Sequence, residues 1–189
     1  MKTELRKKLL AKREIYPHWQ EDSNKILNNF LQKIDLSNFT TIMLYYPHKR
    51  EVDTIPLIKK LIQEKKTVVL PKVSGQDIKP IIIKDLDNLI VGYAGIKEPV
   101  GIQIDTQDID IIVVPAVAYD KEGYRIGYGK GYYDRFLPKL RKDTVKVGFC
   151  YDFQLLEKLP HDPHDIQVDL IITPTQILKT KKEEVKWMK

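Results

Sequence analysis

Apolar residues recur at helical spacing in the first third of the chain. Leu5, Leu9 and Ile15 alternate with lysines and arginines and predict an amphipathic helix that ends before Pro17. Another helix over residues 53–65 is predicted by the same spacing. Between them, a further helix is predicted by apolar residues three and four positions apart, at Ile26, Leu27, Phe30, Leu31 and Ile34. Each helix has one apolar face, which requires a second layer to cover it.

Short apolar runs between the polar stretches predict strands. These runs cover residues 41–46, 67–70, 81–83, 109–114, 145–149 and 170–173. They do not alternate strictly between apolar and polar positions, which is typical of strands that are covered on both faces. The sequence therefore predicts a three-layer α/β/α sandwich with a mostly parallel central sheet, Rossmann-like in type.

Length and composition favour a single domain. The 189 residues are 42% hydrophobic, enough for one substantial core. We predict one α/β domain over residues 1–178 and a charged, mobile tail over residues 179–189, in which Trp187 is the one candidate tether. Residues 91–103 contain three glycines and Pro99 and predict a long irregular connection, and connections of this kind are often functional.

Charge narrows the class of ligand. Lysine and arginine number 32 against 26 aspartates and glutamates, so the formal charge is +6. This balance favours an anionic ligand, whether nucleotide, polyglutamate or nucleic acid, without choosing among them. The single Cys150 forms no internal disulfide, and residues 1–13 are too charged for the apolar core of a secretory signal. We therefore expect a cytoplasmic protein that makes no membrane contact.

Residues 127–134, with the sequence Gly-Tyr-Gly-Lys-Gly-Tyr-Tyr-Asp, form the densest candidate site. Three alternate glycines allow backbone N–H groups to converge on phosphate oxygens, and Lys130 adds a positive charge. A helix predicted over residues 132–140 would direct its positive end at the same anion. The spacing matches neither the Walker A nor the dinucleotide-binding pattern, so a simple turn before a helix is the alternative. Arg125, two residues earlier, adds a second cation and favours the phosphate site.

Charged residues elsewhere are candidates for the same site. Asp134 is placed to hold Mg²⁺ with phosphate oxygens, although a carboxylate in a first helical turn also simply stabilises the helix. Asp169 is either a second ligand or a solvated charge at a strand end. At about 100° per residue, Lys2, Arg6 and Arg13 lie within roughly 40° of one another beside an apolar face. They are able to close over a phosphate, and a solvated helix face is the alternative.

Glu51 follows the predicted strand at residues 41–46, at the edge where ligands gather in open α/β sheets. It lies too far ahead of the next helix to cap it, whereas Asp53 and Thr54 are ordinary capping residues. We therefore predict that Glu51 faces a ligand. The four histidines lack zinc-binding spacing and Cys150 has no partner, so a zinc site is not expected.

Taken in order, these residues resemble a known family. Four segments carry the resemblance, namely Lys2-x-x-Leu5-Arg6, Glu51-x-x-Thr54, Glu98-Pro99 and residues 115–134, of which residues 119–134 are the most specific. Together they are similar to the 5-formyltetrahydrofolate cyclo-ligases, also called methenyltetrahydrofolate synthetases, over nearly the whole chain. The resemblance implies an ATP- and Mg²⁺-dependent cyclisation of 5-formyltetrahydrofolate to 5,10-methenyltetrahydrofolate, with release of ADP and phosphate. The formyl oxygen attacks the γ-phosphate, and the folate N10 then attacks the imino-phosphate and expels phosphate.

The resemblance also implies roles for the matching residues. ATP would be bound by Lys2, Thr3, Glu4, Leu5, Arg6, Arg125, Ile126, Gly127, Tyr128, Gly129, Lys130, Gly131, Tyr132 and Tyr133. The catalytic residues would be Lys130 and Arg125, and the Mg²⁺ ligands Asp134 and Asp169. The folate would be bound by Tyr46, Glu51, Gly127, Tyr128, Gly129, Lys130 and Gly131.

The chain departs from the family pattern at two of these positions. Tyr128 stands where arginine is common, so phosphate contacts are expected to depend more on Lys130, Arg125 and the N-terminal helix. Tyr46 stands at a folate-facing position that is apolar in some relatives.

Two other functions stay open on the residues alone. A basic RNA-binding module would use the charge of +6 and the ten tyrosines, although the cations are spread among acidic residues. A sugar-phosphate or acyl-transfer enzyme on a similar scaffold would need no ATP. With the family resemblance, we expect a monomer that acts on folate and ATP and binds no nucleic acid.

Overall fold

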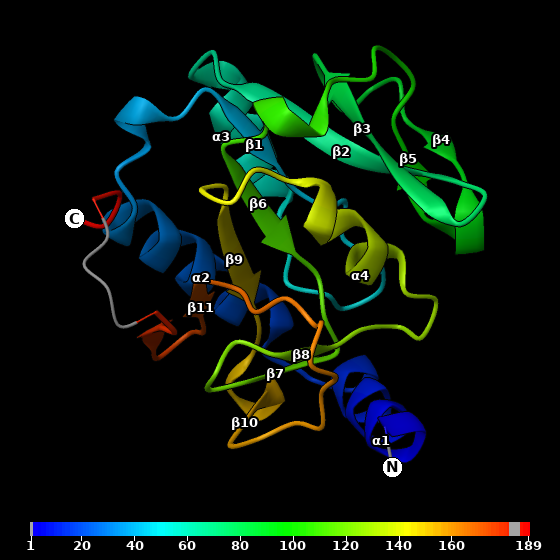
Figure 1. The fold of residues 1–189 in the computed structure, drawn as a ribbon, viewed down its shortest axis with the longest axis vertical. Coiled ribbons are helices and arrows are strands. Elements are labelled where there is room, and N and C mark those ends of the chain that lie inside the picture. Colours follow the sequence, from blue (N-terminus) through cyan, green and yellow to red (C-terminus); the bar gives the residue numbers. More distant parts are fainter. Residues whose placement is uncertain (1, 182–185) are drawn as a thin grey trace.

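A computed structural model describes residues 2–181 and 186–189. The helices are α1 (Lys2–Glu14), α2 (Trp19–Lys33), α3 (Ile55–Gln63) and α4 (Tyr132–Phe136) (Figure 1). The strands are β1 (Thr41–Met43), β2 (Thr67–Ser74), β3 (Asp77–Ile83), β4 (Ile90–Val91), β5 (Lys97–Glu98), β6 (Ile111–Val114), β7 (Ala118–Asp120), β8 (Arg125–Ile126), β9 (Val145–Phe149), β10 (Leu155–Leu156), β11 (Leu170–Ile172) and β12 (Ile177–Lys179). Within the described ranges, none of the helices has the length and apolar character needed to cross a membrane.

Seven strands form the central sheet in the order β12-β11-β9-β6-β1-β2-β3. The five strands from β11 to β2 are parallel, and the two edge strands, β12 and β3, are antiparallel to their neighbours. The predicted mostly parallel sheet is therefore confirmed. Parallel strands place all their carboxyl ends at one edge, where ligands bind in folds of this type.

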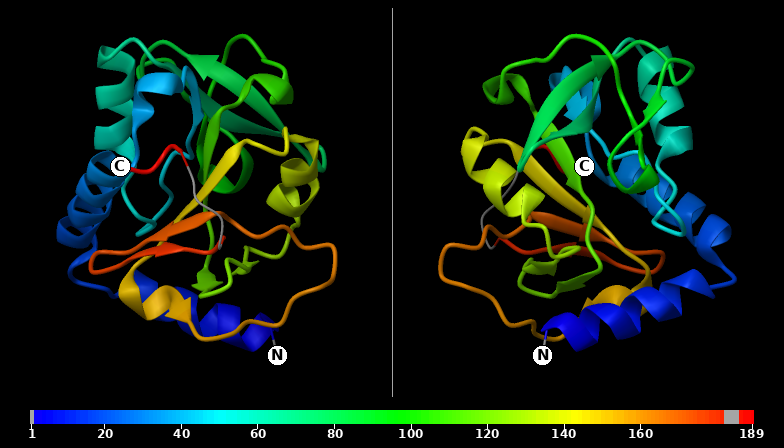
Figure 2. Two further views of the ribbon diagram at one scale, coloured as in Figure 1. Left: turned by 60° about the vertical axis from the view of Figure 1, so that its left-hand side comes forward. Right: turned by 90° about the vertical axis from the view of Figure 1, so that its right-hand side faces the viewer.

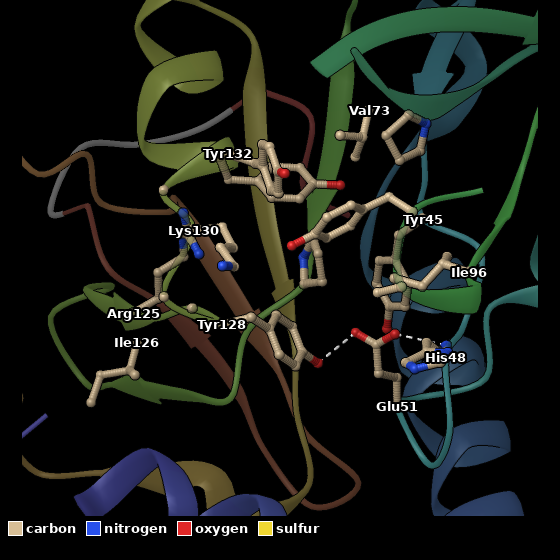
Figure 3. A pocket seen from close by; sticks show the side chains of 18 of the residues that line it. Tyr45, His48, Glu51, Val73, Ile96, Arg125, Ile126, Tyr128, Lys130 and Tyr132 are labelled. Atoms are coloured by element: carbon tan, nitrogen blue, oxygen red, sulfur yellow. Dashed lines mark hydrogen bonds between the residues drawn. The ribbon is translucent and has the colours of Figure 1, made fainter. Parts of the chain in front are cut away.

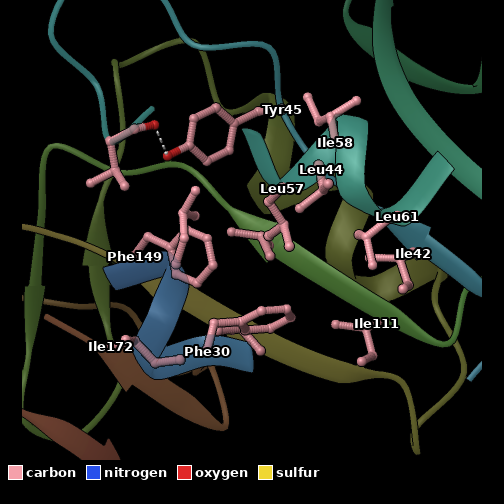
Figure 4. Close-up of a cluster of buried hydrophobic side chains, with 14 of the residues drawn as sticks. Phe30, Ile42, Leu44, Tyr45, Leu57, Ile58, Leu61, Ile111, Phe149 and Ile172 are labelled. Atoms are coloured by element: carbon pink, nitrogen blue, oxygen red, sulfur yellow. Dashed lines mark hydrogen bonds between the residues drawn. The ribbon is translucent and has the colours of Figure 1, made fainter. Parts of the chain in front are cut away.

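Helices cover both faces of this sheet. On one face, Phe30 of α2 and Leu57 of α3 share a buried cluster with Ile42 of β1 (Figure 4). On the other face, Phe136 of α4 lies in a second cluster with Met43 of the same strand. Consecutive strand residues point to opposite faces, so Ile42 and Met43 belong to different layers. The predicted three-layer arrangement is confirmed.

Helix α1 packs on neither face of the large sheet. Its Leu9 shares a small buried cluster with Val117, Ala118 and Ile126, at the three-stranded sheet β10-β7-β8. Figure 2 shows α1 lying along this end of the molecule. Because β8 continues directly into the glycine loop, defined here as residues 127–131, the packing of α1 holds this helix beside the loop.

The strand predicted over residues 67–70 does not stop before Pro71 but continues to Ser74. Pro71 pairs with Pro80 of β3, whereas the pairing of β2 with β1 ends at Val69. The missing N–H of Pro71 therefore removes no bond from the parallel ladder, and the antiparallel hairpin is free to extend.

The helix predicted over residues 132–140 is shorter than expected. Helix α4 ends at Phe136 and is followed by the 3-10 turn Leu137–Lys139. Pro138 has no N–H to donate to the carbonyl four residues earlier, which explains the change. Five residues sum few peptide dipoles, so the predicted dipole contribution to anion binding is small.

The predicted mobile tail needs a partial correction. Lys179 belongs to β12, and near the C-terminus the Trp187 carbonyl accepts a hydrogen bond of 2.8 Å from the N–H of Asp35. Residues 186–189 therefore lie against the end of α2. The part of the predicted tail at residues 182–185 lies outside the described residues.

Gly148 of β9 lies against the fully buried ring of Tyr119. A Cβ atom at position 148 would come within 2.5 Å of the Tyr119 ring. We expect Gly148→Ala to lower the free energy of unfolding by about 1–3 kcal/mol, because a packed core resists added volume. Urea denaturation of both proteins measures this loss, and a change below about 0.5 kcal/mol would show that the ring moves aside.

Candidate active site

A cavity of about 560 Å³ lies beyond the carboxyl ends of the parallel strands (Figure 3). Tyr45 and Tyr46 follow β1 into its wall, and Pro115 does so after β6. The glycine loop forms the opposite wall, and α1 contributes Lys2, Arg6 and Arg13. Its volume lies in the range of small-molecule sites, and its position is the one expected for an open α/β sheet.

The glycine loop has a conformation that other residues rarely adopt. Gly129 and Gly131 have φ angles of +98° and +71°, in the left-handed region. At Gly127 a Cβ atom would meet only the end of the Arg125 side chain, at 2.8 Å. Glycine is therefore required by backbone conformation at two positions of the loop, Gly129 and Gly131.

Lys130 is the cation of this loop that remains available. Its side chain is exposed, lies in the cavity wall and points into the space between Tyr128 and Tyr132 (Figure 3). Its ammonium group forms no hydrogen bond or ion pair with any residue that the structure describes. A mobile ammonium group of this kind is suited to an anionic ligand.

Arg125 and Asp134 pair with each other. The Arg125 guanidinium donates a hydrogen bond of 2.9 Å to one carboxylate oxygen of Asp134. The Arg125 side chain is only 6% exposed, whereas that of Asp134 is 61% exposed. The predicted catalytic cation is thus partly neutralised by the predicted metal ligand. The second Asp134 oxygen has no partner among the described residues, so this carboxylate still suits Mg²⁺, which takes one or two carboxylates with phosphate oxygens.

Asp169 does not accompany Asp134. It precedes β11, toward the amino ends of the parallel strands, and is not part of the cavity wall. One of its oxygens accepts the N–H of Lys146 at 2.9 Å, and the other lies 2.8 Å from the Lys181 ammonium group. The expectation of a shared Mg²⁺ site is therefore corrected, because Asp169 is buried and already paired on the other side of the fold.

The first turns of α1 supply two of the five predicted ligand residues. Lys2 and Arg6 line the cavity, and Arg6 Nε donates a 2.7 Å hydrogen bond to the carbonyl of Gly127. Thr3 and Glu4 are exposed outside the cavity wall, and Leu5 packs against the small cluster beneath α1. A helix presents only one side to a neighbour, so the whole segment cannot contact a single ligand.

Glu51 is buried in the wall opposite the glycine loop, only 8% exposed. One of its oxygens accepts the backbone N–H of His48 at 2.7 Å, and the other accepts the Tyr128 hydroxyl at 2.8 Å (Figure 3). That hydroxyl in turn accepts a 2.6 Å hydrogen bond from the Arg13 guanidinium. The predicted ligand-facing position of Glu51 therefore coincides with a chain of three side chains from distant parts of the sequence.

Burial and the contacts of Glu51 shift the pKa of its carboxyl in opposite directions. Burial raises the pKa of the Glu51 carboxyl, whereas the charge of Arg13, the Tyr128 hydroxyl and the His48 N–H lower this pKa. Burial and the nearby Glu51 charge raise the pKa of Tyr128 well above its usual value, so that its hydroxyl remains a neutral donor at physiological pH.

Aromatic residues form the rest of the wall. Tyr46 lines the cavity as predicted, and the Lys97 ammonium group lies 5.8 Å from its ring centre. The Tyr132 ring meets the Tyr93 ring edge to face at 5.6 Å. Tyr133 also lines the cavity, and its ring centre is 5.7 Å from the Arg125 guanidinium. Flat apolar surfaces beside charged groups suit a heteroaromatic ligand.

Two residues of this wall, Glu98 and Arg13, make contacts that the sequence did not predict. Glu98 is buried and accepts the N–H groups of Val73 and Tyr93 at 3.0 and 2.7 Å, which holds the β4–β5 segment against β2. Arg13 was expected to reach a phosphate and instead reaches Tyr128. The sequence held one signal for this contact, because Arg13 lies one helical turn after the apolar Leu9. A charged residue beside an apolar helix face is seldom buried without a partner.

A further acidic group lies at the mouth of the cavity. Ligand atoms of Asp162, His164 and Asp165 lie within 4.8 Å of one another. Asp162 and His164 are exposed, and the carboxylate of Asp165 accepts the N–H of Asp162. Exposed acidic groups of this kind are common without an ion, so we assign no metal to them.

Comparisons with known proteins point to one family. Residues 1–174 match the model of the 5-formyltetrahydrofolate cyclo-ligase family. Over 177 residues the chain is 34% identical to the 5-formyltetrahydrofolate cyclo-ligase of Mycoplasma pneumoniae, which covers 90% of this chain and 97% of that protein. It is 33% identical over 148 residues to a probable 5-formyltetrahydrofolate cyclo-ligase of Schizosaccharomyces pombe, covering 69% and 72%. The solved 5,10-methenyltetrahydrofolate synthetase of Aquifex aeolicus is 38% identical, with a TM-score of 0.83 and coverage of 97% and 95%.

Proposed function

The chain belongs to the 5-formyltetrahydrofolate cyclo-ligase family and is a ligase of folate metabolism, and we propose that it closes 5-formyltetrahydrofolate to 5,10-methenyltetrahydrofolate with ATP and Mg²⁺. ADP and phosphate would be the other products. The observation that carries this proposal is one cavity in which Lys130, which has no partner among the described residues, and a buried Glu51 lie on opposite walls. We propose that the protein acts as a monomer on these small molecules and binds no nucleic acid.

The phosphates of ATP would lie at the glycine loop. Its left-handed glycines bring backbone close to the cavity, and the cationic side chains of Lys130, Lys2 and Arg6 surround it. Arg6 fixes the loop through the Gly127 carbonyl, so this loop is positioned before ligand arrives. Several N–H groups and mobile cations around one anion are the usual means by which proteins hold a polyphosphate.

The folate would lie against Glu51 and Tyr46. An ionised carboxylate has about four acceptor positions, and the contacts with His48 and Tyr128 use one on each oxygen. One position on each oxygen therefore remains, which suits two parallel hydrogen bonds from adjacent donors on the pteridine ring. Tyr46 offers an aromatic face beside them.

The reaction would place most of its demands on positioning and charge. Attack of the formyl oxygen on the γ-phosphorus would form the new O–P bond and release ADP, and N10 would then attack the activated carbon, lose its proton and expel phosphate. Lys130 would stabilise charge on the transferring phosphoryl group, as is general for phosphoryl transfer. Asp134, together with phosphate oxygens, would hold Mg²⁺, which would supply neutralisation of the phosphate charge. Arg125 would orient Asp134 through their ion pair.

The direct test combines the purified protein with 5-formyltetrahydrofolate, ATP and Mg²⁺. The conjugated methenyl product absorbs in the near ultraviolet, so we expect an absorbance rise that requires ATP. Omission of ATP, and of the folate, are the controls. A protein that is folded and yields no ATP-dependent signal would overturn the proposal.

Asp134→Asn is expected to raise the Mg²⁺ concentration for half-maximal rate by about tenfold, because a neutral amide is a weaker ligand for a hard cation than a carboxylate. The measurement is the rate against free Mg²⁺ at saturating ATP and folate. Asp162→Asn, at the mouth of the cavity, is the matched control and should leave this concentration unchanged. A reversed pattern would move the ion to the acidic group of Asp162, His164 and Asp165.

A further inference from the structure

Arg13 is a buried cation that has no role in the reaction as described so far. It lies in the last turn of α1, is 3% exposed and forms part of the cavity wall. We propose that Arg13 is a positioning residue for the folate, which acts through the Tyr128 hydroxyl to keep Glu51 ionised and its carboxylate oriented toward the cavity. This inference rests on the proposed function, because it takes Glu51 as the group that binds the pteridine ring.

The geometry defines a single connecting atom. The Tyr128 hydroxyl oxygen accepts a hydrogen bond from Arg13 Nη1 at 2.6 Å and donates its own proton to Glu51 Oε2 at 2.8 Å. The Arg13 guanidinium also lies 5.5 Å from the Tyr128 ring centre, within the range of a cation–π contact. Tyr128 as a whole is 42% exposed, so its ring borders the cavity while its hydroxyl is held between two buried charges. Arg13 therefore acts on Glu51 through this one hydroxyl and by its charge.

The protonation state of Glu51 decides what it can bind. A protonated carboxyl carries a donor on one oxygen, so it no longer accepts two parallel hydrogen bonds. Burial raises the pKa of Glu51, and the charge of Arg13 is the largest of the effects that lower it. The titratable or charged groups that face Glu51 come from four segments and are Arg13, Tyr45, His48, Tyr128 and Tyr133. Arg13 is the cation among these whose charge favours the ionised form of Glu51.

Two side chains of helix α1 contact adjacent residues of the glycine loop in different ways. Arg6 contacts the backbone carbonyl of Gly127, whereas Arg13, two turns later, contacts the Tyr128 hydroxyl and through it Glu51 in the opposite wall. Arg13 is therefore the cation of α1 that is connected to the proposed folate-binding carboxylate. Loss of Arg13 should weaken folate binding and leave ATP binding nearly unchanged.

The first experiment measures KM for each substrate separately in the full-length protein. We expect Arg13→Met to raise KM for 5-formyltetrahydrofolate about tenfold and to change KM for ATP by less than about twofold. Arg13→Lys, which retains the charge, should restore most of the loss. Lys8→Met is the matched control, because Lys8 is an exposed cation on the same helix outside the cavity wall. An equal rise in both KM values, or no rise for the folate, would overturn the proposal.

Two further measurements separate positioning from a merely structural role. Tyr128→Phe removes the connecting hydroxyl and keeps the ring, so it should reproduce the folate-specific rise in KM. The double variant with Arg13→Met should then add little, because both changes break the same connection. In Arg13→Met the pKa of Glu51 rises further, so the acid limb of kcat/KM for the folate should move to higher pH. Fully additive effects, or an acid limb that stays in place, would contradict the proposal.

Failure of this inference can be told apart from failure of the proposed function. Equilibrium binding of 5-formyltetrahydrofolate, measured by calorimetry without ATP, does not depend on turnover. Binding that is weakened about tenfold in Arg13→Met and in Tyr128→Phe supports the inference even if no methenyl product forms. Equal binding by the wild type and Tyr128→Phe overturns it even if the reaction proceeds. Near-ultraviolet circular dichroism verifies the fold, and Tyr128→Phe decides the outcome if Arg13→Met does not fold.

Discussion

Lys130→Ala is expected to lower kcat about a hundredfold and to leave KM for 5-formyltetrahydrofolate within about twofold. The ammonium group of Lys130 is exposed in the cavity wall and has no partner among the described residues. It is therefore free to follow the charge that develops on the transferring phosphoryl group. A hundredfold change corresponds to about 2.7 kcal/mol, a magnitude typical of one lost electrostatic contact in a transition state.

The measurement is steady-state turnover at saturating ATP and folate, followed by the absorbance of the product. Lys142→Ala is the control, because Lys142 is also an exposed lysine but lies outside the cavity wall. Lys130→Arg should retain part of the activity, since the charge remains while its shape changes. A folded Lys130→Ala variant with wild-type kcat would remove this residue from the proposed role.

The central part of the fold follows from local sequence patterns. The run at residues 145–149 predicts β9 with its observed bounds, and all five of its residues are buried, as in a strand that is covered on both faces. The edge strand β3 is different. Of residues 77–83, only 81–83 were predicted, because Asp77 and Lys79 are exposed and only a neighbouring strand reveals their pairing. The extent of an edge strand depends on its pairing with the next strand, which the apolar pattern within the segment does not contain.

The candidate site also has a part that local sequence predicts and a part that depends on the tertiary structure. The glycine loop is predictable because its glycines and Lys130 lie within five residues of one another in the sequence. They are therefore close together in any fold. The contact between Arg13 and Tyr128 joins residues 115 positions apart, and its existence depends on how α1 docks on the small sheet. Asp169 is not a shared ligand with Asp134, because its place in the sequence next to a predicted strand does not specify the edge of the sheet on which it lies.

Tyr128 shows how a departure from a family pattern is informative without being decisive. The sequence indicates that the loop lacks a common arginine and that the N-terminal helix should supply more of the positive charge. In the structure Arg13 of α1 approaches the loop. Its guanidinium binds the Tyr128 hydroxyl instead of lying free for a phosphate. The position of the cation was predictable, but its partner required the tertiary structure.

Glu51→Gln is expected to raise KM for 5-formyltetrahydrofolate on the order of tenfold to a hundredfold, because hydrogen bonds to a charged group are worth about 1.5–3 kcal/mol. The amide keeps one acceptor oxygen and turns the second acceptor into a donor. In the wild type, the His48 N–H and the Tyr128 hydroxyl donate to the two carboxylate oxygens. In the variant, these donors would compete with the pteridine ring for the one amide oxygen. The substitution also leaves the buried Arg13 without a compensating carboxylate, a further cost.

The pH dependence of this variant gives the sharper test. Burial raises the pKa of Glu51 above its ordinary value, so wild-type kcat/KM for the folate should fall as the pH drops through this pKa and the carboxylate takes up a proton. Glutamine does not titrate, so the acid limb should disappear in Glu51→Gln while the lower plateau remains. Glu64→Gln, an exposed carboxylate paired with Lys60 on α3, is the control and should keep the wild-type profile. An acid limb that persists unchanged in Glu51→Gln would assign it to another group and separate Glu51 from folate binding.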